Sequence, residues 1–435
     1  MPAHRLFLLP RPSHRILFFA CGFRAIFAHR PAGQLRSFPC SLKVLNSPPG
    51  TQGAVSDVAK AYRTIPVLPE HKRLIVFSHH NLFFIDHCLP FGLSTAAGMQ
   101  GKVADAMIAI LRAHGIPSIK WIDDNVHIRE PIQRRPDGVF EYAYDLAGIH
   151  AFLEPLGIPW QPDKCCDFAD VVQYVGFLWD FKDKRVSLPE KKRVKHVAKI
   201  QLFLDQRRNT RLEAESLAGS LIHLAFVLRA GRSYLAGLFR FIASFKNNFQ
   251  VREPPHSVTS DMRWWRDALS MPVIARSLEL RGAPLDLDLW VDASEEWGIG
   301  LTWGHEFDAW RLCEGWKTDS RDIGWAEAVA LELALLAVIE RGYRDVDVIV
   351  RGDNTGARGA LLKGRGRNPH TNLCVRRIER WSQRFGIEVV PVYVPSADNK
   401  ADAPSRGDFA NAGSQRAFFS FELPDELLPF LEHLP

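Results

Sequence analysis

The hydrophobic pattern of this chain changes period several times, and each change marks a predicted element. Apolar residues recur at helical spacing over residues 103–111, and Gly115 predicts the end of that helix. Two short apolar runs then flank Asp123 and Asp124, which predicts a β-hairpin with two adjacent carboxylates at its tip. The two acids repel one another, and a divalent cation between them and a phosphate would remove that repulsion.

A third carboxylate upstream gives this pair a meaning, because most Asp-Asp pairs are ordinary turn residues. Asp57 follows a strand-like apolar start and precedes Ala61-Tyr62 and a proline-bounded turn. Two-metal phosphoryl transfer needs acids from separate strands that meet at one point. Asp57 and the hairpin acids could supply that arrangement.

Further along the chain the period becomes helical and then alternating. Residues 191–204 predict a helix with a crowded basic face, and residues 212–246 predict two helices joined by a turn at residues 229–232. After a Pro/Gly-containing link, the pattern from residue 285 predicts two strands, a long helix, a buried strand and a last strand. A new unit therefore begins near residue 285.

Four acids in this last unit occupy characteristic places. They lie inside the first strand, in the first turn of the helix, at the end of the buried strand and after the last strand: Asp292, Glu327, Asp353 and Asp402. A lone acid inside an apolar strand is costly unless it is satisfied. Each acid alone would be unremarkable, and their order is what suggests a shared site.

Length and composition are those of an ordinary globular protein. A chain of 435 residues predicts about three domains, with 46% hydrophobic and 24% charged residues. No apolar run approaches the ~20 residues that a membrane helix needs, so we expect no membrane span. The seven cysteines are scattered without a C-x-x-C pair, which favours a reducing compartment over a disulfide framework or zinc site. We expect an intracellular protein of the nucleus or cytoplasm.

The net charge of +6 comes from the N-terminal segment. Residues 1–56 hold seven Lys or Arg and no acid, which leaves −1 for the rest. An Arg-rich, acid-poor start can be a mitochondrial transit peptide. The interpretation we favour is an unrelated or misassigned segment, or the remnant of a truncated gene, so mitochondrial targeting is not expected. Evidence for nucleic-acid binding therefore has to come from local basic clusters and not from the overall charge.

The first part of the chain resembles the palm of a reverse transcriptase. The resemblance lies in Asp57-x-x-x-Ala61-Tyr62, then the LPFGLS block at residues 89–94, then Trp121-Ile-Asp123-Asp124, in which Trp121 replaces the usual tyrosine. It continues through residues 157–164 and 174–180. The resemblance implies that Asp57 and Asp123 hold metals and that Asp124 supports them.

The same resemblance implies a nucleotide site. Tyr62 would lie against the 2′-OH position of the incoming nucleotide, with further contacts from Phe91, Gly92 and Lys164. The partners implied are an RNA template, a DNA primer and dNTPs.

The last part of the chain resembles a ribonuclease H domain. The four acids have the family's order, and NKADAPSR resembles the ending of retroelement versions. The resemblance implies that Asp292, Glu327, Asp353 and Asp402 bind two Mg²⁺ ions and cleave the RNA strand of an RNA–DNA hybrid. Glu332 is a rival to Glu327. The last motif is one residue short of many relatives, so Asp398 is an alternative to Asp402.

Two basic sets could follow a nucleic-acid backbone. The first, on the helix after the palm, is Lys191, Lys192 and Lys195, for which a solvated helix face is an equal alternative. The second lies in a glycine-containing loop of the last unit and consists of Lys363, Arg365 and Arg367.

The fold class predicted is α+β and α/β multidomain. The parts are an unassigned segment at residues 1–50, a palm at 51–188, a helical thumb or connection at 189–284, a ribonuclease H-like domain at 285–408 and a tail at 409–435. The order resembles DIRS-like retroelements, with a fungal source favoured. It implies an RNA-directed DNA polymerase with ribonuclease H, using two Mg²⁺, or Mn²⁺, at each site. The alternative is a non-catalytic or domesticated nucleic-acid-binding fragment that retains at most hybrid cleavage. Oligomeric state is left open.

Overall fold

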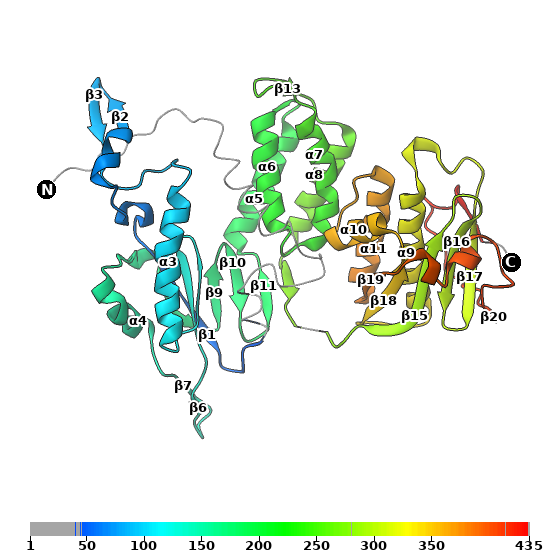
Figure 1. The fold of residues 1–435 in the computed structure, drawn as a ribbon, viewed down its shortest axis with the longest axis horizontal. Coiled ribbons are helices and arrows are strands. Elements are labelled where there is room, and N and C mark those ends of the chain that lie inside the picture. Colours follow the sequence, from blue (N-terminus) through cyan, green and yellow to red (C-terminus); the bar gives the residue numbers. More distant parts are fainter. Residues whose placement is uncertain (1–39, 41–43, 45, 280, 414, 434–435) are drawn as a thin grey trace. The chain divides into compact units, whose positions relative to one another are not determined.

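The chain forms two compact units, each built of helices and sheets (Figure 1). The structure, a computed structural model, describes residues 40, 44, 46–279, 281–413 and 415–433. The described part of the first unit lies within residues 35–195 and 272–279, and that of the second within residues 196–271 and 280–435. The predicted α+β multidomain fold class is confirmed. The predictions for residues 1–39 lie outside the described residues.

The first unit is organised around a four-stranded antiparallel sheet. Its order is β4 (Ser118–Trp121), β5 (Asp124–Arg129), β1 (Gln52–Asp57) and β8 (Cys166–Ala169). The predicted hairpin is therefore confirmed as β4–β5, and the strand that ends in Asp57 lies beside it. Helices α3 (Ala96–Ala113) and α4 (Leu146–Leu153) share a buried apolar cluster that includes Leu111, Ile149 and Leu153.

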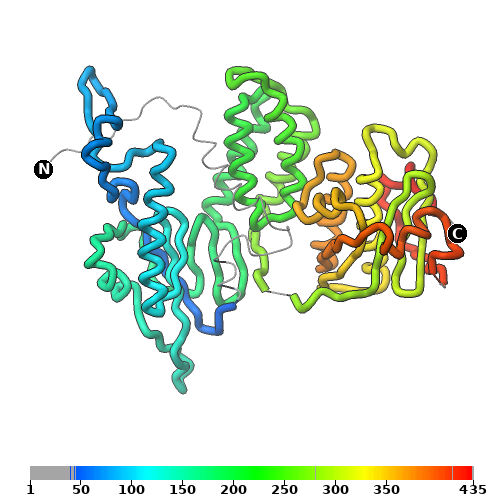
Figure 2. The backbone as a smooth tube through the Cα atoms, viewed as in Figure 1, coloured from blue at the N-terminus to red at the C-terminus, as the bar shows by residue number. Residues whose placement is uncertain are grey.

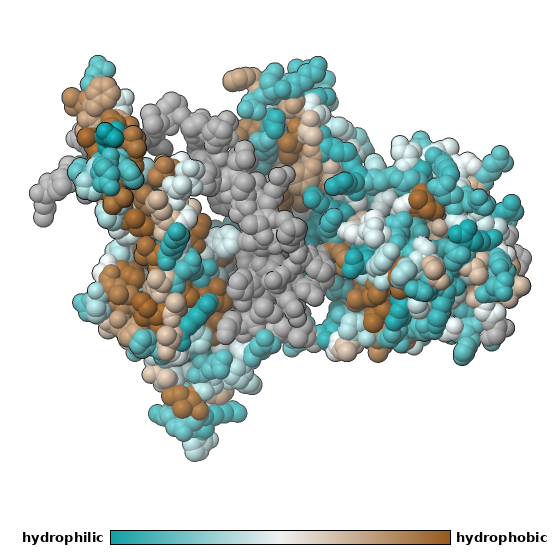
Figure 3. Space-filling model, in the orientation of Figure 1, coloured by the Kyte–Doolittle hydropathy of each residue, from teal (hydrophilic) through white to brown (hydrophobic). Residues whose placement is uncertain are grey.

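The remaining strands of the first unit form three small sheets. The hairpin of β2 (Val76–His79) and β3 (Leu82–Ile85) exposes large apolar side chains such as Leu82 and Phe83. Brown, hydrophobic surface is visible in Figure 3 in the region where Figure 1 draws this hairpin. The other strands are β6 (Gln133–Arg134), β7 (Phe140–Glu141), β9 (Val171–Tyr174), β10 (Phe177–Asp180), β11 (Arg185–Ser187) and β14 (Ala275–Ser277).

Helices dominate the first part of the second unit. Helix α5 (Glu190–Asp205) leads into it, followed by α6 (Arg211–Leu224), η6 (Arg229–Leu235), α7 (Ala236–Ala243) and α8 (His256–Ser270), with the short strands β12 (Asn209–Thr210) and β13 (Val251–Arg252). The predicted pair of helices joined at residues 229–232 is confirmed. Gly231 permits this join, because a Cβ there would lie 2.2 Å from the buried Trp265 ring. Figure 2 shows the path of the backbone through these helices.

A mixed sheet forms the rest of the second unit. Strands β15 (Leu285–Ala293), β16 (Gly298–Trp303) and β17 (Glu306–Leu312) are antiparallel, and β18 (Asp347–Gly352) and β19 (Glu388–Tyr393) continue the sheet parallel to β15. The helices of this part are α9 (Ile323–Glu340), α10 (Thr355–Lys363), α11 (Pro369–Phe385) and α12 (Asp402–Ser405). The strand, helix, strand order that the sequence predicted is confirmed.

The tail completes the edge of this sheet. Strands β20 (Gln415–Arg416) and β21 (Leu431–His433) both pair with β17. Pairing covers backbone groups that an edge strand would otherwise leave open. Among the described residues, no helix combines the length and the apolar character needed to cross a bilayer.

Helix α9 is buried on nearly all sides, and one of its three glutamates, Glu332, needs a buried partner. Glu332 is fully buried and accepts two hydrogen bonds from Arg377 of α11, at 2.6 and 2.7 Å. These two bonds offset the cost of removing the Glu332 carboxylate from water, which would be large without a charged partner. Glu332 is therefore a structural residue between two helices.

We expect Arg377→Met to lower the free energy of unfolding by about 3–5 kcal/mol, because it leaves Glu332 buried without a partner. The double variant Glu332→Leu/Arg377→Met should regain most of the loss. Lys317→Met, which breaks the exposed pair with Glu295, serves as control and should cost about 1 kcal/mol or less. Urea unfolding followed by circular dichroism measures the free energy of unfolding of the three variants. A double variant that is no more stable than Arg377→Met would contradict this interpretation of Glu332.

Candidate active sites

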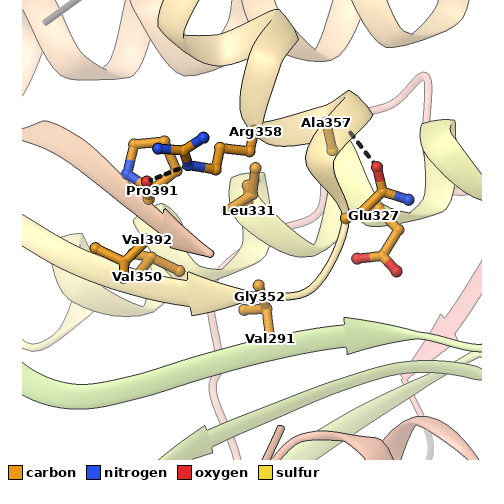
Figure 4. Close-up of a pocket in the computed structure, with 10 residues that line it drawn as sticks. Val291, Glu327, Leu331, Val350, Gly352, Ala357, Arg358, Pro391 and Val392 are labelled. Atoms are coloured by element: carbon orange, nitrogen blue, oxygen red, sulfur yellow. Dashed lines mark hydrogen bonds between the residues drawn. The ribbon is translucent and has the colours of Figure 1, made fainter. Parts of the chain in front are cut away.

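Three acids of the second unit converge at the end of its sheet. Asp292 lies on β15, Glu327 in the first turns of α9, and Asp353 directly after β18; they offer carboxylate oxygens within 4.8 Å of one another. The parallel register aligns Trp290 with Arg351, so the two strands deliver their acids to the same end of the sheet. We call these three residues the acidic triad. Figure 4 shows Glu327, Gly352 and Val291 among the residues that line a cavity of about 10 Å³.

Burial makes the acidic triad electrostatically unfavourable as it stands. Burial, followed by the charges of Asp292 and Asp353, raises the pKa of Glu327 to about 9. Burial also raises the pKa of Asp292 to about 7, assisted by Asp353 and Asp402 and opposed by a hydrogen bond from Ser405. Carboxylate oxygens are the ligands that Mg²⁺ and Mn²⁺ prefer. The triad therefore fits a divalent cation, which would compensate the charges that these side chains impose on one another.

The fourth predicted acid lies nearby, outside the triad. Asp402 begins α12, accepts from Arg406 at 2.9 Å through both oxygens, and is near enough to raise the pKa of Asp292. Asp398, its predicted alternative, is an exposed residue of the 3-10 helix η8 (Ser396–Asp398). The rival Glu332 faces Arg377. The geometry thus brings together Asp292, Glu327 and Asp353, with Asp402 at their edge.

Sequence reasoning missed the neutral side chains that hold the triad. Ser396 donates to Asp353, and Asn399 and Ser405 donate to Asp292. The available signal was the number of polar side chains in SADNKADAPSR, of which only Asp402 or its alternative Asp398 was assigned a role from the sequence.

The three acids predicted to form the polymerase site meet at the tip of the β4–β5 hairpin in the first unit. Asp57 is the Cα partner of Asp124 across β1 and β5, and Asp123 precedes β5 in the turn. Burial, then Asp123 and Asp57, raises the pKa of Asp124 to about 6. Ile122 in this turn has φ +57°, a conformation that β-branched residues rarely adopt. Such strain at an acidic turn is typical of a functional site.

A cavity of about 220 Å³ opens beside these acids. Among its lining residues are Asp57, Asp123 and three of the predicted nucleotide-binding residues, Tyr62, Phe91 and Lys164. The Tyr62 and Phe91 rings meet edge to face at 5.3 Å, and Lys164 Nζ lies 3.1 Å from both oxygens of Asp57. Gly92 is next to Phe91 in the chain and has φ +95°, which favours glycine.

The three lysines of the first basic set, which were predicted to contact a nucleic-acid backbone, differ in their surroundings. Lys191 and Lys195 are exposed, whereas Lys192 turns inward and donates to the Gly176 carbonyl at 3.0 Å. Burial lowers the pKa of Lys192 to about 8.

The second basic set lies at the end of α10 and in the loop that follows it. Lys363 ends the helix, Arg365 and Arg367 lie in the loop, and all three are exposed. The Arg365 guanidinium lies 5.2 Å from the centre of the Phe239 ring. Gly364 has φ +65° at the end of α10, and a Cβ on Gly366 would lie 2.8 Å from the Asn372 nitrogen. Exposed cations on a fixed helix end and loop are suited to phosphate contacts.

Comparison with known proteins gives limited information. No family model matches the chain, and no curated protein sequence matches it. Solved structures of foamy viral protease–reverse transcriptase are similar to this chain. A complex with double-stranded DNA is 14% identical in sequence, with a TM-score of 0.44, and the match covers 86% of this chain. A complex with RNA/DNA hybrid is 15% identical, with a TM-score of 0.44, and the match again covers 86% of this chain. The chain spans 62% and 48% of those two chains. At these values function has to be argued from the two sites themselves.

The raised pKa values predict how stability depends on pH in a chelating buffer. A carboxyl whose folded pKa is raised keeps its proton in the folded state, so stability should fall as pH rises from about 4.5, the ordinary value of Glu, through about 9 for Glu327. We expect the melting temperature to fall across this window, and Glu327→Gln to flatten the fall.

Glu314→Gln, at an exposed position, is the matched control and should leave the slope unchanged. Thermal unfolding monitored by circular dichroism from pH 5 to 9 measures both variants. An equal slope in wild type and Glu327→Gln would contradict the burial of this carboxyl.

Proposed function

We propose that this chain is an RNA-directed DNA polymerase with ribonuclease H activity, derived from a retroelement, and that hybrid cleavage is the activity its geometry supports best. The observation that carries the proposal is the acidic triad, three carboxylates from two strands and a helix within 4.8 Å of one another. Gathering three repelling acids at one point, two of them buried and Asp353 half-buried, is costly for folding, which argues for a role that needs them together.

In this proposal Asp292, Glu327 and Asp353, with Asp402 at the edge, hold two Mg²⁺ ions, or Mn²⁺ in their place. Bound metals would activate a water and stabilise the charge that develops on the cleaved phosphate. The protein's own part is to keep the four carboxylates oriented. The exposed Lys363, Arg365 and Arg367 would contact the hybrid backbone at a distance from the chemistry, which positions the substrate without reading its sequence.

The first unit supports a second activity, template-directed nucleotide addition. Asp57, Asp123 and Asp124 would hold the corresponding metals, and the cavity between Tyr62, Phe91 and Lys164 would take the dNTP, with Gly92 giving a close backbone approach. The exposed Lys191 and Lys195 would follow the RNA template or DNA primer. A DIRS-like, fungal origin and a place in the nucleus or cytoplasm belong to the same proposal.

One observation favours the narrower alternative, a fragment that retains hybrid cleavage alone. Lys164 holds both oxygens of Asp57 at 3.1 Å, so one proposed metal ligand of the polymerase site already has a cationic partner. Within the described residues, no lysine or arginine makes a salt bridge with a triad acid; Arg406 pairs with Asp402 and acts on Asp292 through its charge alone. The two sites therefore differ in how readily a metal would bind.

For hybrid cleavage, we expect Asp292→Asn and Asp353→Asn each to reduce the rate at least ~100-fold, because each removes a metal-binding charge. The assay follows a labelled RNA strand in an RNA–DNA hybrid with Mg²⁺ or Mn²⁺. Asp319→Asn, an exposed acid outside the site, controls for the change of charge. Cleavage that survives both triad substitutions would overturn the proposal.

For polymerisation, extension of a DNA primer on an RNA template should require Asp57 and Asp123. We expect Asp123→Asn to reduce extension at least ~100-fold and to leave hybrid cleavage unchanged. Extension absent in wild type, beside cleavage that depends on Asp292, would establish the narrower alternative. Extension that persists in Asp123→Asn would exclude the polymerase site proposed here.

A further inference from the structure

One short segment of the second unit supplies donors to two of the three triad acids. Ser396 donates its hydroxyl to Asp353, and Asn399 Nδ2 lies 3.0 Å from Asp292 Oδ1. Ser405 Oγ lies 2.5 Å from Asp292 Oδ2. We call residues 396–405 the clamp segment. Both oxygens of Asp292 are therefore held from the same piece of chain.

The clamp segment has a fixed seat on the neighbouring strand. A Cβ on Gly300 of β16 would lie 2.4 Å from the Ser405 nitrogen and 2.6 Å from the Ala401 carbonyl oxygen. Since these are backbone atoms, a side chain at this position would have to displace the segment itself. Ser294, which follows β15, donates to the Ser405 carbonyl at 2.7 Å. The segment thus rests directly on the sheet that carries Asp292.

An ion pair ties the middle of the clamp segment to β15. Lys400 Nζ lies 2.9 and 2.8 Å from the two oxygens of Asp288. Asp288 has φ +50° where the β15–β18 register shifts, and it also accepts from Trp290 Nε1 at 2.7 Å. Bulges beside active sites commonly direct a nearby side chain. Here the bulge presents Asp288 to Lys400, four residues before Asp292.

Neutral donors suit a metal-binding carboxylate for a simple reason. Each carboxylate oxygen has two lone pairs, so one can accept from Asn399 or Ser405 while the other faces a cation. A lysine or arginine in their place would compete with the cation for the same charge. The amide of Asn399 is itself fixed, because it also donates to the Val291 carbonyl at 3.1 Å and accepts from the Ala401 nitrogen at 3.2 Å.

We propose that the clamp segment orients Asp292 for divalent-cation binding, with Asn399 and Ser405 as positioning residues. This inference rests on the proposed metal site. It adds that Asn399 and Ser405, which do not bind the cation themselves, contribute to the affinity of the site for the cation. Outer hydrogen-bond partners of metal ligands typically contribute about 10–100-fold to affinity.

The test is Mn²⁺ binding to the full chain, measured by calorimetry. We expect Asn399→Ala and Ser405→Ala each to weaken binding about tenfold or more. Two matched controls lie elsewhere in the same unit: Asn411→Ala, which removes another Asn-to-Asp hydrogen bond, and Ser270→Ala, which removes a hydroxyl from a helix surface. Both controls should bind Mn²⁺ as wild type does. Near-UV circular dichroism verifies that each variant is folded.

The seat is tested separately with Gly300→Ala, which should lower Mn²⁺ affinity by displacing the segment. Gly219→Ala is its control, because nothing lies within 4 Å of a Cβ there. If Gly300→Ala does not fold, the two side-chain variants still decide the question.

The outcomes separate this inference from the proposed function. Wild-type affinity in folded Asn399→Ala and Ser405→Ala would overturn the clamp and leave the metal site intact. Weakened Mn²⁺ binding in a chain that cleaves no hybrid would support the clamp and overturn the proposed activity. Absence of Mn²⁺ binding in wild type would overturn both.

Discussion

The repulsion among buried carboxylates is the constraint on which the second unit depends. Asp292, Glu327 and the half-buried Asp353 place carboxylate oxygens within 4.8 Å of one another, and the burial of the first two leaves little water to screen them. The raised pKa values of Asp292 and Glu327 express this cost. Such an arrangement persists only if the surrounding structure imposes it, and here two parallel strands and a fully packed helix do so.

The same helix shows two ways to bury a glutamate. Glu327 and Glu332 are five residues apart, which places them about 140° apart around the helix axis. Glu332 meets Arg377 and becomes a neutral ion pair in the core. Glu327 instead faces two other acids and becomes part of the triad. Position around the helix, and not residue type, separates the structural acid from the candidate catalytic one.

In the hairpin site of the first unit, the repulsion between carboxylates is reduced in a different way. Asp57 and Asp124 face each other across two strands, and Lys164 supplies a positive charge directly. Burial nevertheless raises the pKa of Asp124 to about 6. A lysine that is largely exposed can leave a carboxylate when a stronger cation arrives, whereas a packed neutral donor such as Ser405 remains in place. The two sites thus combine acids with different kinds of support.

Much of this protein was determined by local sequence. Hydrophobic period predicted the β4–β5 hairpin, helices α3 and α9 and the strands of the mixed sheet, because each element buries one characteristic set of positions. The order of the acids along those elements was also readable, since an acid inside or directly after an apolar strand is conspicuous.

Only the tertiary structure decided which groups meet. It separated Glu327 from Glu332 and placed Asp402 near enough to raise the pKa of Asp292. It also turned Lys192 inward and packed a tail without a clear period onto β17. The clamp segment depends on Gly300, 105 residues before Ser405, and no local pattern reports such a contact. Period and spacing determine elements, whereas hydrogen bonds between distant segments form only when the sheet aligns them.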